Sequence, residues 1–154
     1  MIRIKQRVKF LLVAAALITA CLLLLFVLPS RALTKGHAEL LFELHRNRFE
    51  EAASLTLQQG SGSGVRTPPG VDDMELYGTY SGCVEFSMGG FGLVPSSTYW
   101  GVIYATEDTP VGWGGLEMEY TWDGQSWVWR EENGDNRSYV TKLDDHWYLY
   151  EMSF

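Results

Sequence analysis

The chain has 154 residues with a formal net charge of −7 at pH 7, and its length leaves room for one folded domain of about 85 to 120 residues after the N-terminal segment. All 19 acidic residues but only eight of the 12 basic residues lie after position 29, so this part alone carries a net charge of −11. Phosphate binding needs clustered lysine and arginine, which makes nucleic acid a poor partner for such a surface.

The N-terminal segment is the most informative feature. It runs from Phe10 through Leu28 without a charged residue, and four basic but no acidic residues precede it. About 20 apolar residues in a helix span the hydrocarbon core of a bilayer, so we predict a transmembrane signal-anchor helix at residues 10–29, in contact with membrane lipid. By the positive-inside rule, the basic stub at residues 1–9 is cytoplasmic and the C-terminal domain of this single-pass protein is extracytoplasmic.

Two other interpretations of this segment stay open. A cleaved signal peptide has a shorter apolar region and a small-residue cleavage site, which residues 30–32 match poorly. The run Ile18, Thr19, Ala20, Cys21 resembles the lipobox of bacterial lipoproteins, which implies lipidation of Cys21, although the apolar run continues to Leu28.

Residues 30–59 predict an amphipathic juxtamembrane helix, with its regular part at residues 34–59. Its apolar and partly apolar residues recur at spacings of three and four, namely Ala38, Leu41, Phe42, His45, Phe49, Ala52, Ala53 and Thr56. This face must be covered by the downstream sheet, which we prefer, or by a second copy of the helix. Residues 60–73, rich in Gly, Ser and Pro, are interpreted as a flexible linker.

Residues 74–154 predict a small, aromatic-rich antiparallel β-meander, so the fold class is α+β. The expected strands are 75–80, 83–88, 99–105, 116–122, 126–131, 138–143 and 146–154. A type I′ turn at Asp123 and Gly124 would pair Tyr120 with Trp127, Met118 with Trp129 and Glu117 with Arg130. The last hairpin is expected to turn near Asp144 and Asp145. Its final strand is apolar on both faces, which predicts an interior position in the sheet.

Binding residues are sought in two long loops rich in Gly and Pro, at 89–98 and 106–115. Tryptophans could line a carbohydrate or peptide groove, and Trp100, Trp113 and Trp147 are the candidate binding surface among Trp100, Trp113, Trp122, Trp127, Trp129 and Trp147. The favoured interpretation is that such residues belong to the core.

No catalytic, cofactor or metal site is predicted, because the sequence contains no G-x-S-x-G elbow and its three histidines lack a metal-ligand spacing. Cys83, the only cysteine outside the predicted membrane segment, is interpreted as a buried filler rather than a nucleophile. Residues 131–136 are interpreted as a solvated hairpin turn rather than a Ca²⁺ loop. Asn136 begins an N-glycosylation sequence that matters only in a eukaryotic secretory route.

The order of basic stub, spanning helix, amphipathic helix and antiparallel sheet resembles type IV pilins and pseudopilins in outline. Their processing motif is absent, because no glycine precedes Phe10 and no acidic residue stands five positions into the apolar segment. We therefore expect a membrane-anchored, extracytoplasmic, non-enzymatic domain that binds a protein or another ligand. The alternatives are an assembly subunit that oligomerises through the 34–59 helix and, third, a small extracytoplasmic enzyme.

Overall fold

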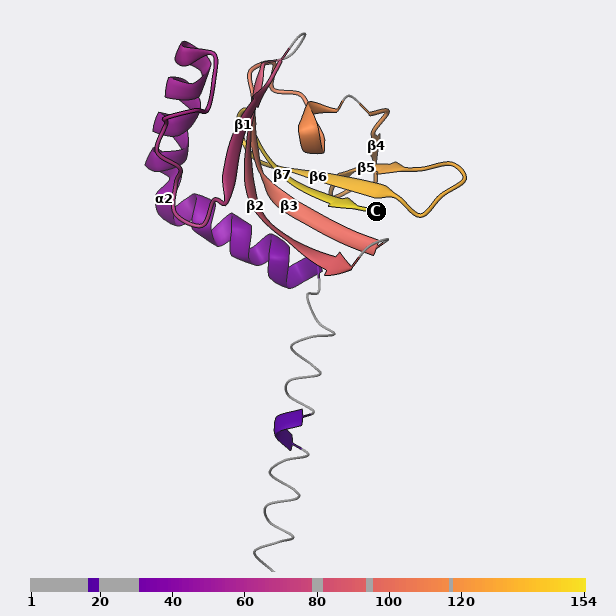
Figure 1. The fold of residues 1–154 in the computed structure, drawn as a ribbon. Helices are drawn as coiled ribbons and strands as arrows, with labels where there is room; N and C mark the ends of the chain where they lie inside the picture. Colours follow the sequence, from indigo (N-terminus) through magenta and orange to yellow (C-terminus); the bar gives the residue numbers. More distant parts are fainter. Residues whose placement is uncertain (1–16, 20–30, 79–81, 94–95, 117) are drawn as a thin grey trace, which may run out of the picture. The chain divides into compact units, whose positions relative to one another are not determined.

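The computed structural model describes residues 17–19, 31–78, 82–93, 96–116 and 118–154 (Figure 1). The chain divides into two compact units, Met1–Leu33 and Thr34–Phe154. The predicted stub at 1–9 and the predicted transmembrane helix at 10–29, with Cys21, lie outside the described residues except for positions 17–19, which are helical. Among the residues described, no helix has both the length and the apolar character that a membrane crossing needs.

The larger unit combines a long helix with a seven-stranded antiparallel sheet, which confirms the α+β class. Its elements are helix α2 (Arg31–Gln59), strands β1 (Asp73–Tyr77), β2 (Cys83–Leu93) and β3 (Ser96–Ala105), the 3-10 turn η1 (Trp113–Gly115), and strands β4 (Thr121–Trp122), β5 (Trp127–Arg130), β6 (Arg137–Asp144) and β7 (Trp147–Ser153). The strand order is β1-β2-β3-β7-β6-β5-β4. Two meanders, β1–β3 and β4–β7, therefore meet where β3 pairs with β7.

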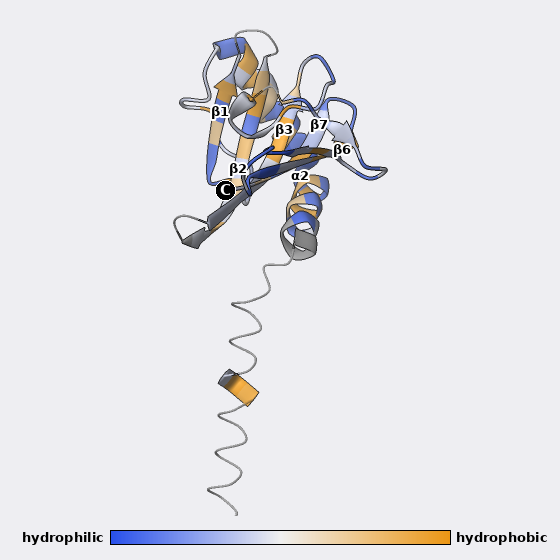
Figure 2. Ribbon diagram, turned by 90° about the vertical axis from the view of Figure 1, so that its right-hand side faces the viewer, coloured by the Kyte–Doolittle hydropathy of each residue, from blue (hydrophilic) through white to orange (hydrophobic). Residues whose placement is uncertain are grey.

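Helix α2 covers one face of the sheet, as its apolar stripe predicts. Phe42 and Phe49 are fully buried, and their ring centroids lie 5.0 and 6.2 Å from that of Trp147 on β7. Apolar and polar residues alternate around the helix in Figure 2, which is the pattern of an amphipathic helix. The helix bends at His45, where φ is −124° and ψ is 21°, and Figure 1 shows its two halves following the sheet.

Strand β7 is the fourth of the seven strands, which confirms its predicted interior position. Its first four residues are buried. Trp147 and Leu149 lie on the face of the sheet that helix α2 covers, and Tyr148 and Tyr150 lie on the opposite face, which we call the inner face. The preceding turn lies at Asp145 and His146, with Asp144 paired to Trp147, close to the predicted place.

The predicted register of the β4–β5 hairpin is wrong by two residues. Trp122 pairs with Trp127, so Tyr120 does not, and the ring centroids of the two tryptophans are 4.6 Å apart. The loop contains four residues because the Asp123 carboxylate accepts hydrogen bonds from the N–H groups of Gln125 and Ser126. Gly124 supplies the positive φ of 101° that this turn needs.

Two predicted element boundaries also need correction. The expected loop at 89–98 is mainly an extension of the β2–β3 hairpin, since residues 89–93 pair with residues 96–100. Its glycines are needed because the ring of Trp100 lies where a side chain at Gly89 would stand. The expected strand at 116–122 is reduced to β4, and Glu117 lies outside the described residues.

The segment expected to be a flexible linker packs on the domain. Val65 and Val71 contact the core between helix and sheet, and Pro68 is buried. Hydrogen bonds from Ser61 N–H to Thr56 O (3.2 Å) and from Val71 N–H to Pro68 O (3.3 Å) fold the segment back along α2. Its few apolar residues outweigh the flexible composition because the helix presents a surface for them to cover.

Candidate functional site

The first chemically distinctive feature is a buried carboxyl group on the inner face. Glu85 of β2 is only 2% exposed. One of its oxygens accepts hydrogen bonds from the Tyr150 hydroxyl (2.6 Å) and the Ser87 hydroxyl (3.1 Å), and the other accepts the Gly114 N–H (2.7 Å). We call Glu85, Tyr150, Ser87 and Gly114 the Glu85 network.

Turn η1 closes this network from the side opposite α2 (Figure 1). Gly115 approaches Tyr77 so closely that a Cβ at position 115 would lie 2.5 Å from the Tyr77 Cβ. The ring of Trp113 stacks on Tyr99, with centroids 5.8 Å apart. These contacts hold the Gly114 N–H over the carboxyl group, so Glu85 anchors the long connection between β3 and β4 to the sheet.

Burial controls the electrostatics of this region. Burial raises the pKa of Glu85, and Glu75, its cross-strand partner on β1, raises it further. Burial also raises the pKa of Tyr150, and it raises the pKa of Cys83 to about 11. Cys83 is therefore a thiol at neutral pH and not an activated nucleophile. The hydrogen bonds of the Glu85 carboxyl join β2 to β7 and to the loop that contains Gly114.

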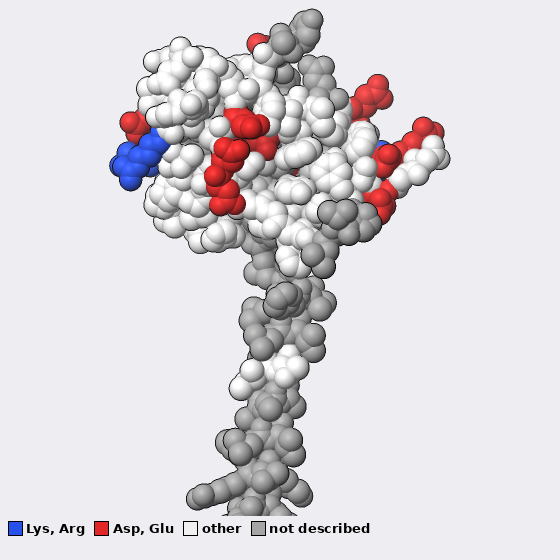
Figure 3. Space-filling model, viewed as in Figure 1, with Lys and Arg blue, Asp and Glu red and all other residues white. Residues whose placement is uncertain are grey.

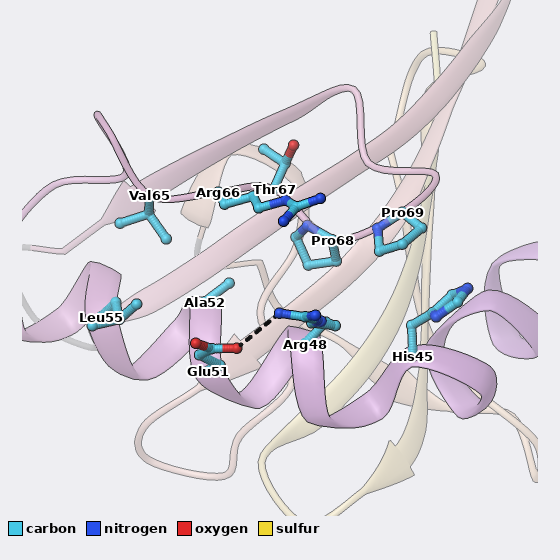
Figure 4. A pocket seen from close by; sticks show the side chains of 10 residues that line it. All are labelled: His45, Arg48, Glu51, Ala52, Leu55, Val65, Arg66, Thr67, Pro68 and Pro69. Atoms are coloured by element: carbon cyan, nitrogen blue, oxygen red, sulfur yellow. Dashed lines mark hydrogen bonds and ion pairs between the residues drawn. The ribbon is translucent and has the colours of Figure 1, made fainter.

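The second feature is an open groove with a volume of about 580 Å³ between helix α2 and residues 65–69 (Figure 4). Its lining residues, which define what we call the basic groove, are His45, Arg48, Glu51, Ala52, Leu55, Val65, Arg66, Thr67, Pro68 and Pro69. The helix contributes one wall, and the packed segment at residues 65–69, which we call the connector, contributes the other. The volume falls within the range of about 300 to 1,000 Å³ that is typical of ligand sites.

Two guanidinium groups face this groove from its opposite walls. Figure 4 shows Arg48 on the helix with its guanidinium group directed toward Glu51, and Arg66 on the loop beside Thr67 and Pro68. Arg48 forms an ion pair with Glu51 at 3.4 Å, but both side chains are 60% exposed, so the pair contributes little free energy. Among the residues that the structure describes, Arg66 has no acidic partner within ion-pair distance.

The basic groove contrasts with the rest of the domain surface. In Figure 3 the main basic patch on the visible face lies over helix α2, whereas acidic side chains dominate elsewhere on that face. Two arginines and one acidic side chain line the groove, in a chain that carries 19 acidic residues and 12 lysines and arginines. The groove is therefore the surface feature best suited to an anionic group.

The three tryptophans expected to form a binding surface do not share one face. Trp147 is 2% exposed and lies in the core beneath α2. Trp100 lies half-buried on the same side of the sheet, whereas Trp113 packs on the inner face against Tyr99 and Phe154. Of the two loops proposed as binding loops, 106–115 remains a loop and covers the inner face.

Two of the three histidines, His45 and His146, lie in different surroundings. His45 is half-buried and lines the basic groove, whereas His146 has a φ of 67° in the last turn and stacks on Tyr104. No group of three or more His, Cys, Asp or Glu within the described ranges is arranged to hold a metal ion. Residues 131–135 are exposed, and the hairpin closes through Glu131 N–H to Asn136 O at 3.0 Å.

Comparison with known proteins adds no assignment: no protein family, curated protein or solved structure matches the chain.

Proposed function

We propose that the chain is a membrane-anchored, extracytoplasmic and non-enzymatic interaction module, with the basic groove as its binding surface. The apolar run at residues 10–28 supports the membrane anchor. The observation that carries the binding proposal is that Arg48 and Arg66 face one open groove of about 580 Å³ from opposite walls. The Glu85 network supports a non-enzymatic role, because the Glu85 carboxyl group is buried and hydrogen-bonded through both of its oxygens to groups of the domain.

A photo-crosslinking experiment tests this proposal in the membranes of the cells that make the protein. A photoreactive amino acid replaces Thr67, which lines the groove, or Glu132, which is exposed in the β5–β6 turn and serves as the control. We expect a discrete adduct from position 67 and none from position 132. The same pattern at both positions, or no adduct from position 67, would count against the groove as the binding surface.

A second candidate function, self-association through α2, is favoured by one observation. Leu40 and Leu44 lie one turn apart and are 57% and 66% exposed, outside the stripe that the sheet covers. Light scattering of the full chain in a nonionic detergent should then give the mass of an oligomer, and replacing both leucines by serine should give the monomer mass. A wild-type chain that is already monomeric at micromolar concentration would remove this candidate.

A further inference from the structure

We propose that the basic groove binds a carboxylate group held between the guanidinium groups of Arg48 and Arg66. This inference rests on the proposed function and specifies the chemistry of its ligand. A guanidinium group presents N–H donors in a planar fork that matches the two oxygens of a carboxylate. The two arginines come from separate segments, 18 positions apart in the sequence, which the packed connector brings together.

The charges around the groove favour an anion. Helix α2 contributes the charged side chains of Arg48 and Glu51, and the connector contributes Arg66. Two like charges that line one groove raise each other's energy, and an anion bound near both reduces that repulsion. Glu51 neutralises Arg48 only in part, because their contact of 3.4 Å is long and solvent-exposed.

The remaining lining residues favour a carboxylate with an aliphatic body over a phosphate. Apolar side chains line the groove beside the arginines, namely Ala52, Leu55, Val65, Pro68 and Pro69. These residues can bury methylene groups, which a phosphate lacks. Glu51 and the net charge of −11 after position 29 both disfavour a dianion or an anionic bilayer surface. An acidic side chain of a partner protein and a free aliphatic acid share the chemistry that fits.

A titration of the full chain in nonionic detergent tests the proposal, with the arginine side chains followed by ¹⁵N NMR. The probes are the capped peptide acetyl-Ala-Glu-Leu-amide, the same peptide with glutamine in place of glutamate, free glutarate and inorganic phosphate. We expect saturable shifts at Arg48 and Arg66 with the glutamate peptide or with glutarate, and binding at least tenfold weaker for the glutamine peptide and for phosphate. Tighter binding of the peptide than of glutarate would identify a protein segment as the ligand, and the reverse order would identify a free acid.

Matched variants connect the binding to the groove. Arg66→Gln and Arg48→Gln should each weaken carboxylate binding about tenfold, because each removes a charged donor pair. Glu51→Gln should strengthen binding, and Arg137→Gln, an exposed arginine on β6, should leave it unchanged. All four positions are exposed, so the far-UV spectrum should not change.

Three results would overturn the inference: no saturable shift with either carboxylate, equal binding of the glutamine peptide or of phosphate, or undiminished binding by Arg66→Gln. These results differ from failure of the proposed function. A discrete crosslink from position 67 without carboxylate binding would leave the interaction module in place and refute only its ligand class.

Discussion

Removing one hydroxyl group from the Glu85 network should destabilise the domain measurably. In Tyr150→Phe the ring still fills the inner face, but the Glu85 carboxyl loses a donor at 2.6 Å and Ser87 loses a contact at 3.3 Å. A hydrogen bond to a charged group contributes about 1.5 to 3 kcal/mol, whereas one between neutral groups contributes about 0.5 to 1.5 kcal/mol. The cost should therefore be about 2 kcal/mol where Glu85 is ionised and about 1 kcal/mol where it is protonated.

Urea unfolding of the full chain in nonionic detergent, followed by near-ultraviolet circular dichroism, measures this difference. The free energy of unfolding of wild type and Tyr150→Phe is compared in a series from pH 4 to pH 9, with Tyr99→Phe as the control. Tyr99 is partly exposed, and its ring rather than its hydroxyl makes its contacts with Trp113 and Phe154, so its replacement should cost less than about 0.5 kcal/mol. If Tyr150→Phe is as stable as wild type throughout this pH series, the Tyr150 hydroxyl does not stabilise the carboxyl as the network requires.

Three further predictions concern stability. Because the pKa of Glu85 is raised in the folded state, stability should fall as pH rises from the ordinary value near 4.5 through the folded pKa, and Glu85→Gln should remove this fall in a urea series between pH 4 and 9. Contact with Lys142 lowers the pKa of Asp108 to about 2, so stability should be lost as pH falls from 3.8 toward 2; Lys142→Met should lose less over this interval in the same assay. Phe49→Ala should lower the free energy of unfolding by about 3 to 5 kcal/mol, because it creates a cavity between helix and sheet. Leu44→Ala, on the exposed side of α2, should change the free energy of unfolding in urea by less than about 0.5 kcal/mol. Equal effects of the two substitutions would contradict the packing of α2.

The parts of the fold that local pattern controls could be predicted from the sequence. The apolar stripe of α2 indicated which side chains would face the sheet, and Phe42 and Phe49 are buried there. The two apolar faces of the last strand indicated the centre of the sheet, because only an interior strand with both faces covered can bury both sets. In both cases the periodicity of one continuous segment contains the information.

Features that depend on a distant segment could not be predicted in this way. Glu85 alternates with Val84 and Phe86, a pattern that indicates a solvent-facing side chain, but residues 106–115 fold over it. The β4–β5 register differs by two residues from the predicted one, because the side chain of Asp123 closes a longer loop than a type I′ turn. A shift of two residues leaves each side chain on the face of the sheet where it was predicted.

The basic groove belongs to the same class. Arg48 and Arg66 form no local motif, and they line one groove only because a segment rich in Gly, Ser and Pro packs against α2 through Val65 and Pro68. No periodicity in either segment indicates this packing.

The most direct test of the central proposal is arginine footprinting, which compares the protein in its native membranes with the purified full chain. Phenylglyoxal modification of each arginine is measured by mass spectrometry in both states. If the basic groove is occupied by its partner, Arg48 and Arg66 should react several-fold more slowly in native membranes than in the purified chain. Arg130 and Arg137, which are exposed and paired in the β5–β6 hairpin, should react equally in both states. Equal reactivity of all four arginines in the two states would contradict the assignment of the groove as the binding surface.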